Sequence, residues 1–132
     1  MRVVLDASAA VNLVMRTERA AAIIEHLERS SLVLAPSLFH SEVGNTLWKY
    51  VRAGALDRHA ATERYEEAAG LVDSFLPDEE LVTEALSAAV RHGHPLYDLL
   101  YVILARRHDC KLITEDRKLA ALASEIDKDL LP

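Results

Sequence analysis

The sequence predicts an α/β fold with a parallel sheet, and two features of the chain indicate it. Short apolar runs rich in β-branched residues recur at 3–5, 32–35 and 111–114, and longer stretches between them place apolar residues three and four apart. The first pattern is typical of strands buried on both faces, and the second of amphipathic helices. Because helices serve as crossovers between strands that alternate with them, this order favours parallel pairing.

Length and composition limit the class of protein. The chain has 132 residues, of which 51% are hydrophobic and 27% charged, and this suits one globular domain. No apolar run approaches the ~20 residues of a membrane span, so no membrane association is expected. Cys110 is the only cysteine, which excludes an intrachain disulfide and suits the reducing cytoplasm. A net charge of −6 excludes the broad positive field of an ordinary nucleic-acid-binding protein, so contact with nucleic acid needs a local basic rim or a metal ion.

Most of the expected elements begin or end at residues that suit that role. Thr17, Ser37, Asp57 and Asp78 are expected N-caps in front of amphipathic stretches, and Gly54 supplies a helix C-terminus. In chain order the expected elements are a strand at 3–5, helices at 8–15 and 18–29, a strand at 32–35, helices at 38–53, 58–73, 79–91 and 96–108, a strand at 111–114, and a helix that begins at 117.

The second half of the chain also contains a connector, an unusually apolar helix and a tail. Residues 74–77 are expected to be a connector. The helix at 96–108 is apolar nearly all round in its middle, which is typical of a buried helix. The tail, 126–132, is a candidate for a last strand.

Two acidic residues are placed by the strands that precede them. Asp6 ends the first strand, and Asp116 lies two residues beyond the strand at 111–114. Because both follow the carboxyl ends of parallel strands, both are expected at the edge of the sheet where ligands of open α/β folds bind. A structural alternative for Asp6 is the N-cap of the helix that follows it.

Two more acids are placed by helices. Glu42 lies in the first turns of the helix at 38–53, with Asn45 three residues later on the same polar stripe. Asp98 lies in the first turn of the most apolar helix, where burying an unpaired carboxylate would lower the stability of the fold. The structural alternatives are simple solvation for Glu42 and stabilisation of the helix dipole for Asp98.

Four carboxylates gathered at one edge would repel one another. Two unit charges ~5 Å apart at an effective dielectric of ~20 repel by on the order of 3 kcal/mol. A divalent cation relieves that repulsion, and oxygen ligands without Cys or His spacing indicate Mg²⁺ or Mn²⁺. Such an ion activates water and stabilises a phosphoryl transition state.

These motifs resemble those of the PIN-domain nucleases, and the size and spacing are most similar to the toxins of VapBC toxin–antitoxin pairs. The resemblance covers essentially the whole chain. It rests on four motifs in order, Asp6-Ala-Ser8, Glu42-x-x-Asn45-x-Leu47, Tyr97-Asp98-x-x-Tyr101 and Thr114-x-Asp116.

The resemblance implies a single-domain α/β/α sandwich with a central parallel sheet. It also implies an endoribonuclease that depends on Mg²⁺ or Mn²⁺ and hydrolyses RNA with a metal-activated water, forms a homodimer, and is neutralised by a small co-encoded antitoxin. By this match the catalytic, metal-binding acids are Asp6, Glu42, Asp98 and Asp116, and the supporting polar residues are Ser8, Asn45 and Thr114.

Other interpretations stay open at this point. Arg117 and Lys118 follow Asp116 directly and are candidate phosphate-binding residues, with solvated side chains as the alternative. An aspartyl-phosphate phosphatase needs Asp-x-Asp after its first strand, where this chain has Asp6-Ala7-Ser8, and the acid pair and late lysine of a signalling receiver are not found. A non-catalytic α/β binding module, whose acids serve only as caps and dipole partners, is the remaining alternative.

Overall fold

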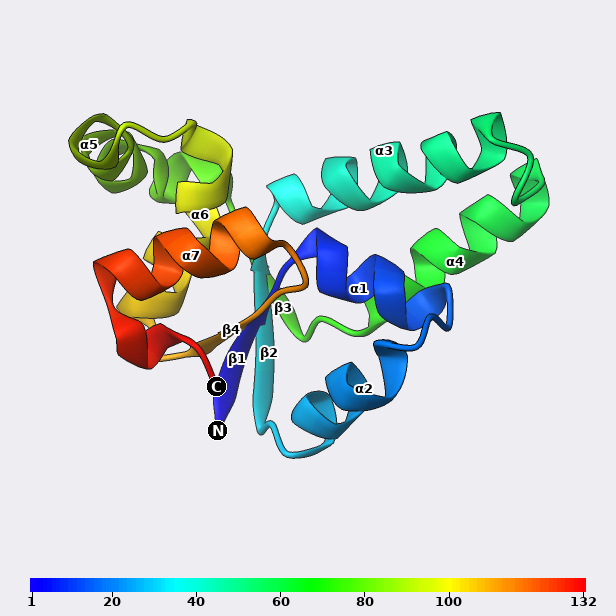
Figure 1. Ribbon diagram of the computed structural model, residues 1–132, viewed down its shortest axis with the longest axis horizontal. Coiled ribbons are helices and arrows are strands. Elements are labelled where there is room, and N and C mark those ends of the chain that lie inside the picture. The colour runs from blue at the N-terminus through cyan, green and yellow to red at the C-terminus, as the bar shows by residue number, and fades with distance from the viewer.

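A sheet of four parallel strands runs through the middle of the molecule in the computed structural model, which describes residues 1–132 (Figure 1). Its strands are β1 (Arg2–Leu5), β2 (Leu32–Pro36), β3 (Ser74–Leu76) and β4 (Lys111–Ile113), arranged in the order β3-β2-β1-β4. Val4 of β1 pairs with Leu34 of β2 on one side and with Leu112 of β4 on the other. The predicted parallel sheet and α/β class are thereby confirmed.

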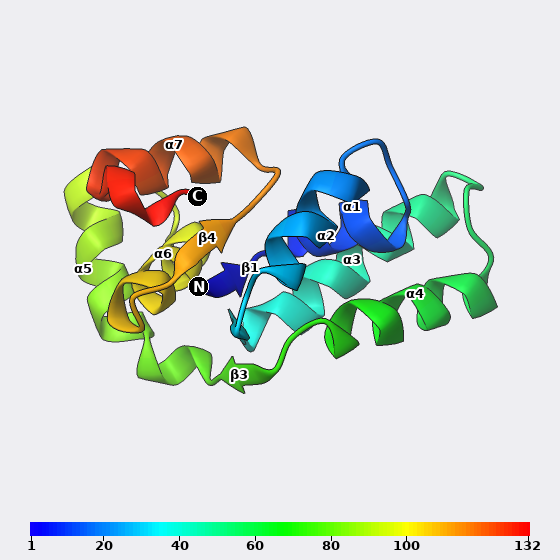
Figure 2. The same ribbon diagram turned by 90° about the horizontal axis from the view of Figure 1, so that it is seen from below.

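Helices cover both faces of this sheet. The helices α1 to α4 lie on one face, and α5 to α7 on the other (Figures 1 and 2). Their bounds are α1 Ala7–Val14, α2 Ala20–Glu28, α3 Leu38–Arg52, α4 Arg58–Gly70, α5 Val82–His92, α6 Leu96–Arg107 and α7 Arg117–Ile126. Short 3₁₀ turns occupy Asp78–Glu80 and Lys128–Leu130. None of the helices combines the length and the hydropathy needed to cross a membrane.

Two apolar clusters hold the layers together because strand residues alternate between the faces. Val3 and Leu5 of β1 point into the cluster with α1 to α4, while Val4 points into the cluster with α5 to α7. All seven residues from Leu99 to Ala105 of α6 are buried. This confirms the prediction of a buried helix. Asp98 directly precedes this buried run, so the packing of the helix fixes the position of its backbone.

Two late segments differ from expectation. Residues 74–77 were expected to be a connector, but Ser74–Leu76 form β3, an edge strand paired with β2. Three residues with two apolar side chains carry too weak a pattern to separate a strand from a loop. The tail forms no strand, because Asp127 accepts a hydrogen bond from the Asp129 backbone N–H and starts a 3₁₀ turn that buries Leu130.

Three of the expected helix caps act elsewhere. The Ser37 hydroxyl donates to the Leu76 carbonyl and accepts from the Asp78 backbone N–H, so it ties β2 to the end of β3. Asp78 accepts from the Leu38 backbone N–H instead of capping α5. The Thr17 hydroxyl donates to the Asn12 side chain at 2.8 Å, and α2 begins only at Ala20. Asp57 is the expected cap that holds, accepting from the Ala60 N–H at 2.7 Å.

Candidate active site

The site lies beyond the carboxyl ends of β1 and β4. From β1 the chain crosses to β2 on one side, and β4 lies on the other side of β1. The connections therefore diverge between β1 and β4, which makes this crevice the topological switch point where open α/β sheets bind ligands. Asp6 follows β1 directly, and Asp116 comes three residues after β4.

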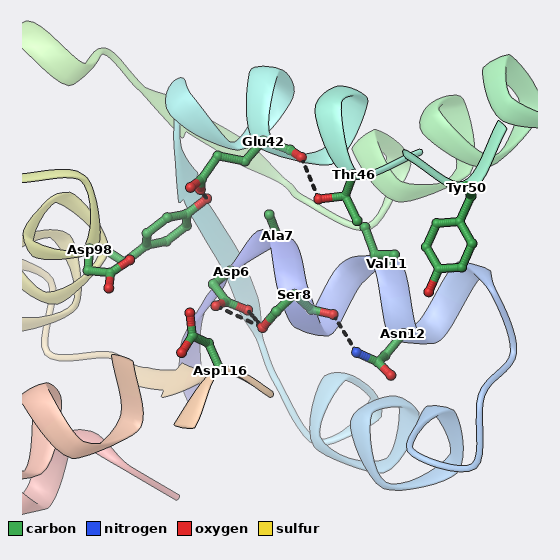
Figure 3. A pocket seen from close by; sticks show the side chains of 11 residues that line it. Asp6, Ala7, Ser8, Val11, Asn12, Glu42, Thr46, Tyr50, Asp98 and Asp116 are labelled. Carbon is green, nitrogen blue, oxygen red and sulfur yellow. Dashed lines mark hydrogen bonds between the residues drawn. The ribbon is translucent and has the colours of Figure 1, made fainter. Parts of the chain in front are cut away.

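All four acids singled out from the sequence line one pocket of about 280 Å³ (Figure 3). Asp6 and Asp116 come from the strand ends, Glu42 from α3 and Asp98 from the first turn of α6. The remaining lining residues are Ala7, Ser8, Val11, Asn12, Thr46, Tyr50 and Tyr101.

Asp6 is the most constrained of the four. It is 4% exposed and is the only buried charged residue of the chain. One carboxylate oxygen accepts from the Ala9 backbone N–H at 2.9 Å and thereby caps α1, while the other accepts from the Thr114 hydroxyl at 2.6 Å. Ser8 also donates to it, at 2.8 Å. The carboxylate therefore serves as a helix cap and a pocket wall at once.

Burial raises the pKa of Asp6 from 3.8 to about 6, and the negative charge of Glu42 adds to this effect. Hydrogen bonds from Thr114, Ala9 and Ser8 act in the opposite direction and limit the rise in pKa. Burial therefore disfavours the ionised form of Asp6, and no positively charged side chain of the protein offsets this effect. A positive charge in the pocket would favour the ionised form.

Glu42 faces the pocket through a hydrogen bond with a buried tyrosine. The Tyr101 hydroxyl donates to Glu42 Oε1 at 2.6 Å. Burial raises the pKa of Glu42, and the charges of Asp98, Asp116 and Asp78 raise it further, against the bond from Tyr101. Burial also raises the pKa of Tyr101, so its hydroxyl stays a donor that holds Glu42 in one orientation.

Asp98 sits at the opening of α6, one turn after His94. Its side chain is 25% exposed, and Oδ2 lies 3.6 Å from His94 Nε2. Burial and the charge of Asp116 raise the pKa of Asp98, while His94 and Lys118 lower it. Asp98 and Asp116 line the same pocket, where the sequence places both acids.

Thr114 joins two of the acids through one hydroxyl. It donates to Asp6 and accepts from the Asp116 backbone N–H at 3.0 Å. Asp116 in turn caps α7, accepting from Lys118 N–H at 2.8 Å with Oδ1. Ser8 accepts from the Glu115 backbone N–H at 2.9 Å, so the β4–α7 loop is tied to the β1–α1 turn.

Asn45 is the predicted supporting residue that the structure does not bring into the pocket. It is exposed, whereas Thr46 and Tyr50 line the pocket beside Glu42. On a helix, Thr46 and Tyr50, four and eight residues after Glu42, lie within about a quarter-turn of Glu42 on one side. Asn45, three residues after Glu42, lies on the other side. The polar stripe is therefore on the expected helix, but the side of it that faces the pocket is the one with Thr46 and not the one with Asn45.

Arg117 and Lys118 are both exposed at the start of α7. Arg117 lines a neighbouring groove together with Thr114 and Asp116. Lys118 lies near enough to lower the pKa of Asp98. Neither cation lines the acid pocket itself.

Two further polar residues line the pocket: Tyr101, which belongs to the Tyr97-Asp98-x-x-Tyr101 motif but is given no role in the site by the sequence, and Asn12. Tyr101 carries the one hydroxyl in an otherwise aliphatic buried stretch. Because a buried hydroxyl needs a hydrogen-bond partner, this residue type at this position could have indicated a polar contact in the site. Asn12 Nδ2 donates to the Ser8 carbonyl at 2.9 Å. No motif pointed to Asn12.

The residues of the pocket match a divalent cation in chemistry. No three His, Cys, Asp or Glu side chains are arranged to bind one ion directly. Mg²⁺ keeps several of its waters and needs only one or two protein carboxylates, so four carboxylates spaced around about 280 Å³ fit a hydrated ion. Mn²⁺ takes the same oxygen ligands.

Comparisons with known proteins point to one family. The model of the PIN domain matches residues 3–125. A protein of Pyrobaculum aerophilum named Ribonuclease VapC3 is 34% identical over 125 residues, which cover 91% of this chain and 93% of that protein. Ribonuclease VapC1 of Mycobacterium tuberculosis is 31% identical over 118 residues, covering 89% of this chain and 88% of that protein.

Solved structures agree with this fold. The crystal structure of PAE2754 from Pyrobaculum aerophilum superposes with a TM-score of 0.73 at 30% identity, covering 92% of this chain and 84% of that one. Mycobacterium tuberculosis VapC20, described as a toxin that cleaves the sarcin-ricin loop, superposes with a TM-score of 0.65 at 17% identity, covering 90% of this chain and 93% of its own, and shows the fold alone. The resemblance read from the four motifs is confirmed: the chain belongs to the PIN domain family.

Proposed function

We propose that this protein is a metal-dependent endoribonuclease and the toxin of a toxin–antitoxin pair, with residues 1–132 forming one domain. The observation that carries the proposal is the convergence of Asp6, Glu42, Asp98 and Asp116 on one pocket at the switch point of the sheet. Kinship to proteins named VapC ribonucleases supports RNA as the substrate.

The acids are proposed to hold Mg²⁺ or Mn²⁺, which when bound supplies the positive charge that stabilises a phosphoryl group and activates water. The chain's own contribution is to fix the carboxylates before the ion arrives. Thr114 and Ser8 hold Asp6, and Tyr101 occupies Glu42 Oε1. Glu42 Oε2 keeps no protein hydrogen bond, so it is the atom proposed to take a proton from the attacking water.

Purified protein without a partner is expected to cleave RNA when Mg²⁺ or Mn²⁺ is added and to stop when EDTA is added in excess. The reason is that the pocket supplies negative charge only, and the RNA phosphate brings more. The measurement is gel analysis of a broad panel of structured and single-stranded RNAs. Intact RNA throughout, from a folded and metal-loaded sample, would overturn the proposal.

A small co-encoded antitoxin is the proposed protein partner. The groove between α3 and α4, of about 460 Å³, presents an apolar surface that includes Leu47, Val51 and the half-exposed Trp48. An Arg or Lys of the partner reaching the acids would replace the cation by charge-assisted hydrogen bonds. The single unpaired Cys110 suits the cytoplasm, where such a pair would meet RNA.

A homodimer is the proposed state in solution. Leu86 and Val90 of α5 are 53% and 77% exposed, and Thr83 and Ser87 beside them carry no charge. Two copies with a net charge of −6 each meet with least repulsion on an uncharged face. Light scattering at tens of micromolar is expected to give the dimer mass, and Val90→Glu the monomer mass. A wild-type monomer would remove this part of the proposal.

A further inference from the structure

We propose that a second groove, next to the acid pocket, binds a phosphate of single-stranded RNA that flanks the cleaved bond, with Arg19 and Arg117 as its cationic contacts. This inference rests on the proposed function and names a subsite for that substrate. The groove has a volume of about 420 Å³ and is lined by Arg19, Thr114, Glu115, Asp116, Arg117 and Ala120.

The groove and the acid pocket share a wall. Asp116 lines both, and Thr114, which donates to Asp6, lines the groove. An RNA strand whose scissile phosphate lies among the acids therefore has this groove as a path for its neighbouring nucleotide. The two arginines of the groove supply positive charge locally, although the protein as a whole has a net charge of −6.

Arg19 is presented by a built turn. Its backbone N–H donates to the Thr17 hydroxyl at 3.2 Å, and that hydroxyl donates to the Asn12 side chain at 2.8 Å. Asn12 lines the acid pocket and donates to the Ser8 carbonyl at 2.9 Å. The position of Arg19 is thus tied to the same β1–α1 turn that holds Asp6.

Glu115 holds Arg19 in the absence of RNA. The Arg19 Nε lies 3.1 Å from Glu115 Oε2, with the two side chains 58% and 20% exposed. The backbone of Glu115 is fixed by its hydrogen bond to Ser8, so the carboxylate stays beside the groove. Ion pairs this exposed contribute little to stability, so an RNA phosphate can take over Arg19 at small cost.

Arg117 completes the pair of cations. It is exposed and its side chain takes part in no ion pair or hydrogen bond of the chain, so it is free to meet a ligand. A guanidinium binds phosphate in a bidentate manner. Glu115 therefore acts as a resident competitor for Arg19, and the groove is expected to bind RNA more tightly without that carboxylate.

The test is fluorescence anisotropy with a labelled single-stranded oligouridylate, with Ca²⁺ in place of Mg²⁺ and the RNA checked for intactness on gels afterwards. Arg19→Gln and Arg117→Gln are each expected to weaken binding roughly fivefold or more and to lower the log–log salt slope by about 0.7, the value for one phosphate contact on a single strand. Glu115→Gln is expected to tighten binding. Arg29→Gln is the matched control, because Arg29 sits in another exposed ion pair, with Glu25, at the far end of α2.

Binding by both arginine variants within twofold of the Arg29→Gln control would overturn the subsite, as would a wild type that binds no RNA. Competition by polyglutamate as strong as by RNA would assign the groove to an acidic protein segment instead and overturn the phosphate assignment. The cleavage assay keeps the two claims apart. If the wild type cleaves RNA and the arginine variants bind RNA as the wild type does, the subsite alone is contradicted. If the arginine variants bind RNA more weakly but the wild type cleaves no RNA, the proposed function alone is contradicted.

Discussion

Asp98→Asn is expected to lower RNA cleavage roughly 100-fold or more at saturating Mg²⁺, because loss of a carboxylate proposed to hold the ion would remove several kcal/mol of transition-state stabilisation. The shape of the side chain is kept and only its charge is lost. Asp98 lines the acid pocket, and the buried run that begins at Leu99 fixes its backbone. The measurement is the single-turnover cleavage rate of one RNA, with the circular dichroism spectrum recorded for both proteins.

Asp57→Asn is the matched control for that variant. Asp57 is also an aspartate at a helix start, but it caps α4 and lies outside the pocket. We expect this control to cleave RNA at the wild-type rate. If the two variants cleave equally well, Asp98 serves only the dipole of α6 and its assignment to the metal site is wrong.

The free energy of unfolding in EDTA is expected to fall as pH rises from about 4 to about 6. The pKa of Asp6 is raised from 3.8 to about 6, so between these values the folded state binds a proton that the unfolded state has released. Stability is therefore greatest at the acidic end of this window and is lost as pH rises through the folded-state pKa. For Asp6 alone the loss amounts to ~3 kcal/mol at neutral pH. Burial raises the pKa of Glu42 and Asp98 too, and these add to it in the same direction.

Asp6→Asn isolates the share of Asp6, because the amide keeps an oxygen for the Ala9 N–H but has no charge to desolvate. Urea unfolding at a series of pH values is expected to give a flatter profile for this variant than for the wild type. Added Mn²⁺ is expected to flatten the wild-type profile, since a cation favours the ionised acids. Parallel profiles for the two proteins in EDTA would show that Asp6 is not the titrating group.

The sequence predicted the sheet well because its central strands are buried on both faces. Apart from the first residues of β1 and β4, Arg2 and Lys111, these strands carry only apolar side chains, so β1, β2 and β4 are recognisable as apolar runs. The sequence does not predict the edge strand β3, because its two apolar residues form no strand pattern. Only its pairing with β2 identifies it as a strand. Likewise, Ser37 and Asp78 looked like helix caps, and only the pairing of β2 with β3 brings them together.

The site was predictable as far as topology decides it. The carboxyl ends of parallel strands must share an edge, so the sequence alone places Asp6 and Asp116 together, and both line the pocket. The side of α3 that faces the pocket was not decided in this way, and Thr46 lines the pocket in the place expected for Asn45. Arg19 was missed because its contact with Glu115 joins residues 96 positions apart.

The central claim, that the four acids form one metal site, is tested most directly by thermal unfolding of the wild type and Asp98→Asn, each in EDTA and in Mn²⁺. In EDTA we expect the variant to be at least as stable as the wild type, since removal of one of several like charges relieves repulsion on the order of a kcal/mol per neighbour. In Mn²⁺ we expect the wild type to gain stability as RT ln(1 + [L]/Kd) and the variant to gain less. A variant destabilised by the same ~0.3–1 kcal/mol in both conditions, as a lost helix-dipole contact predicts, would contradict the account.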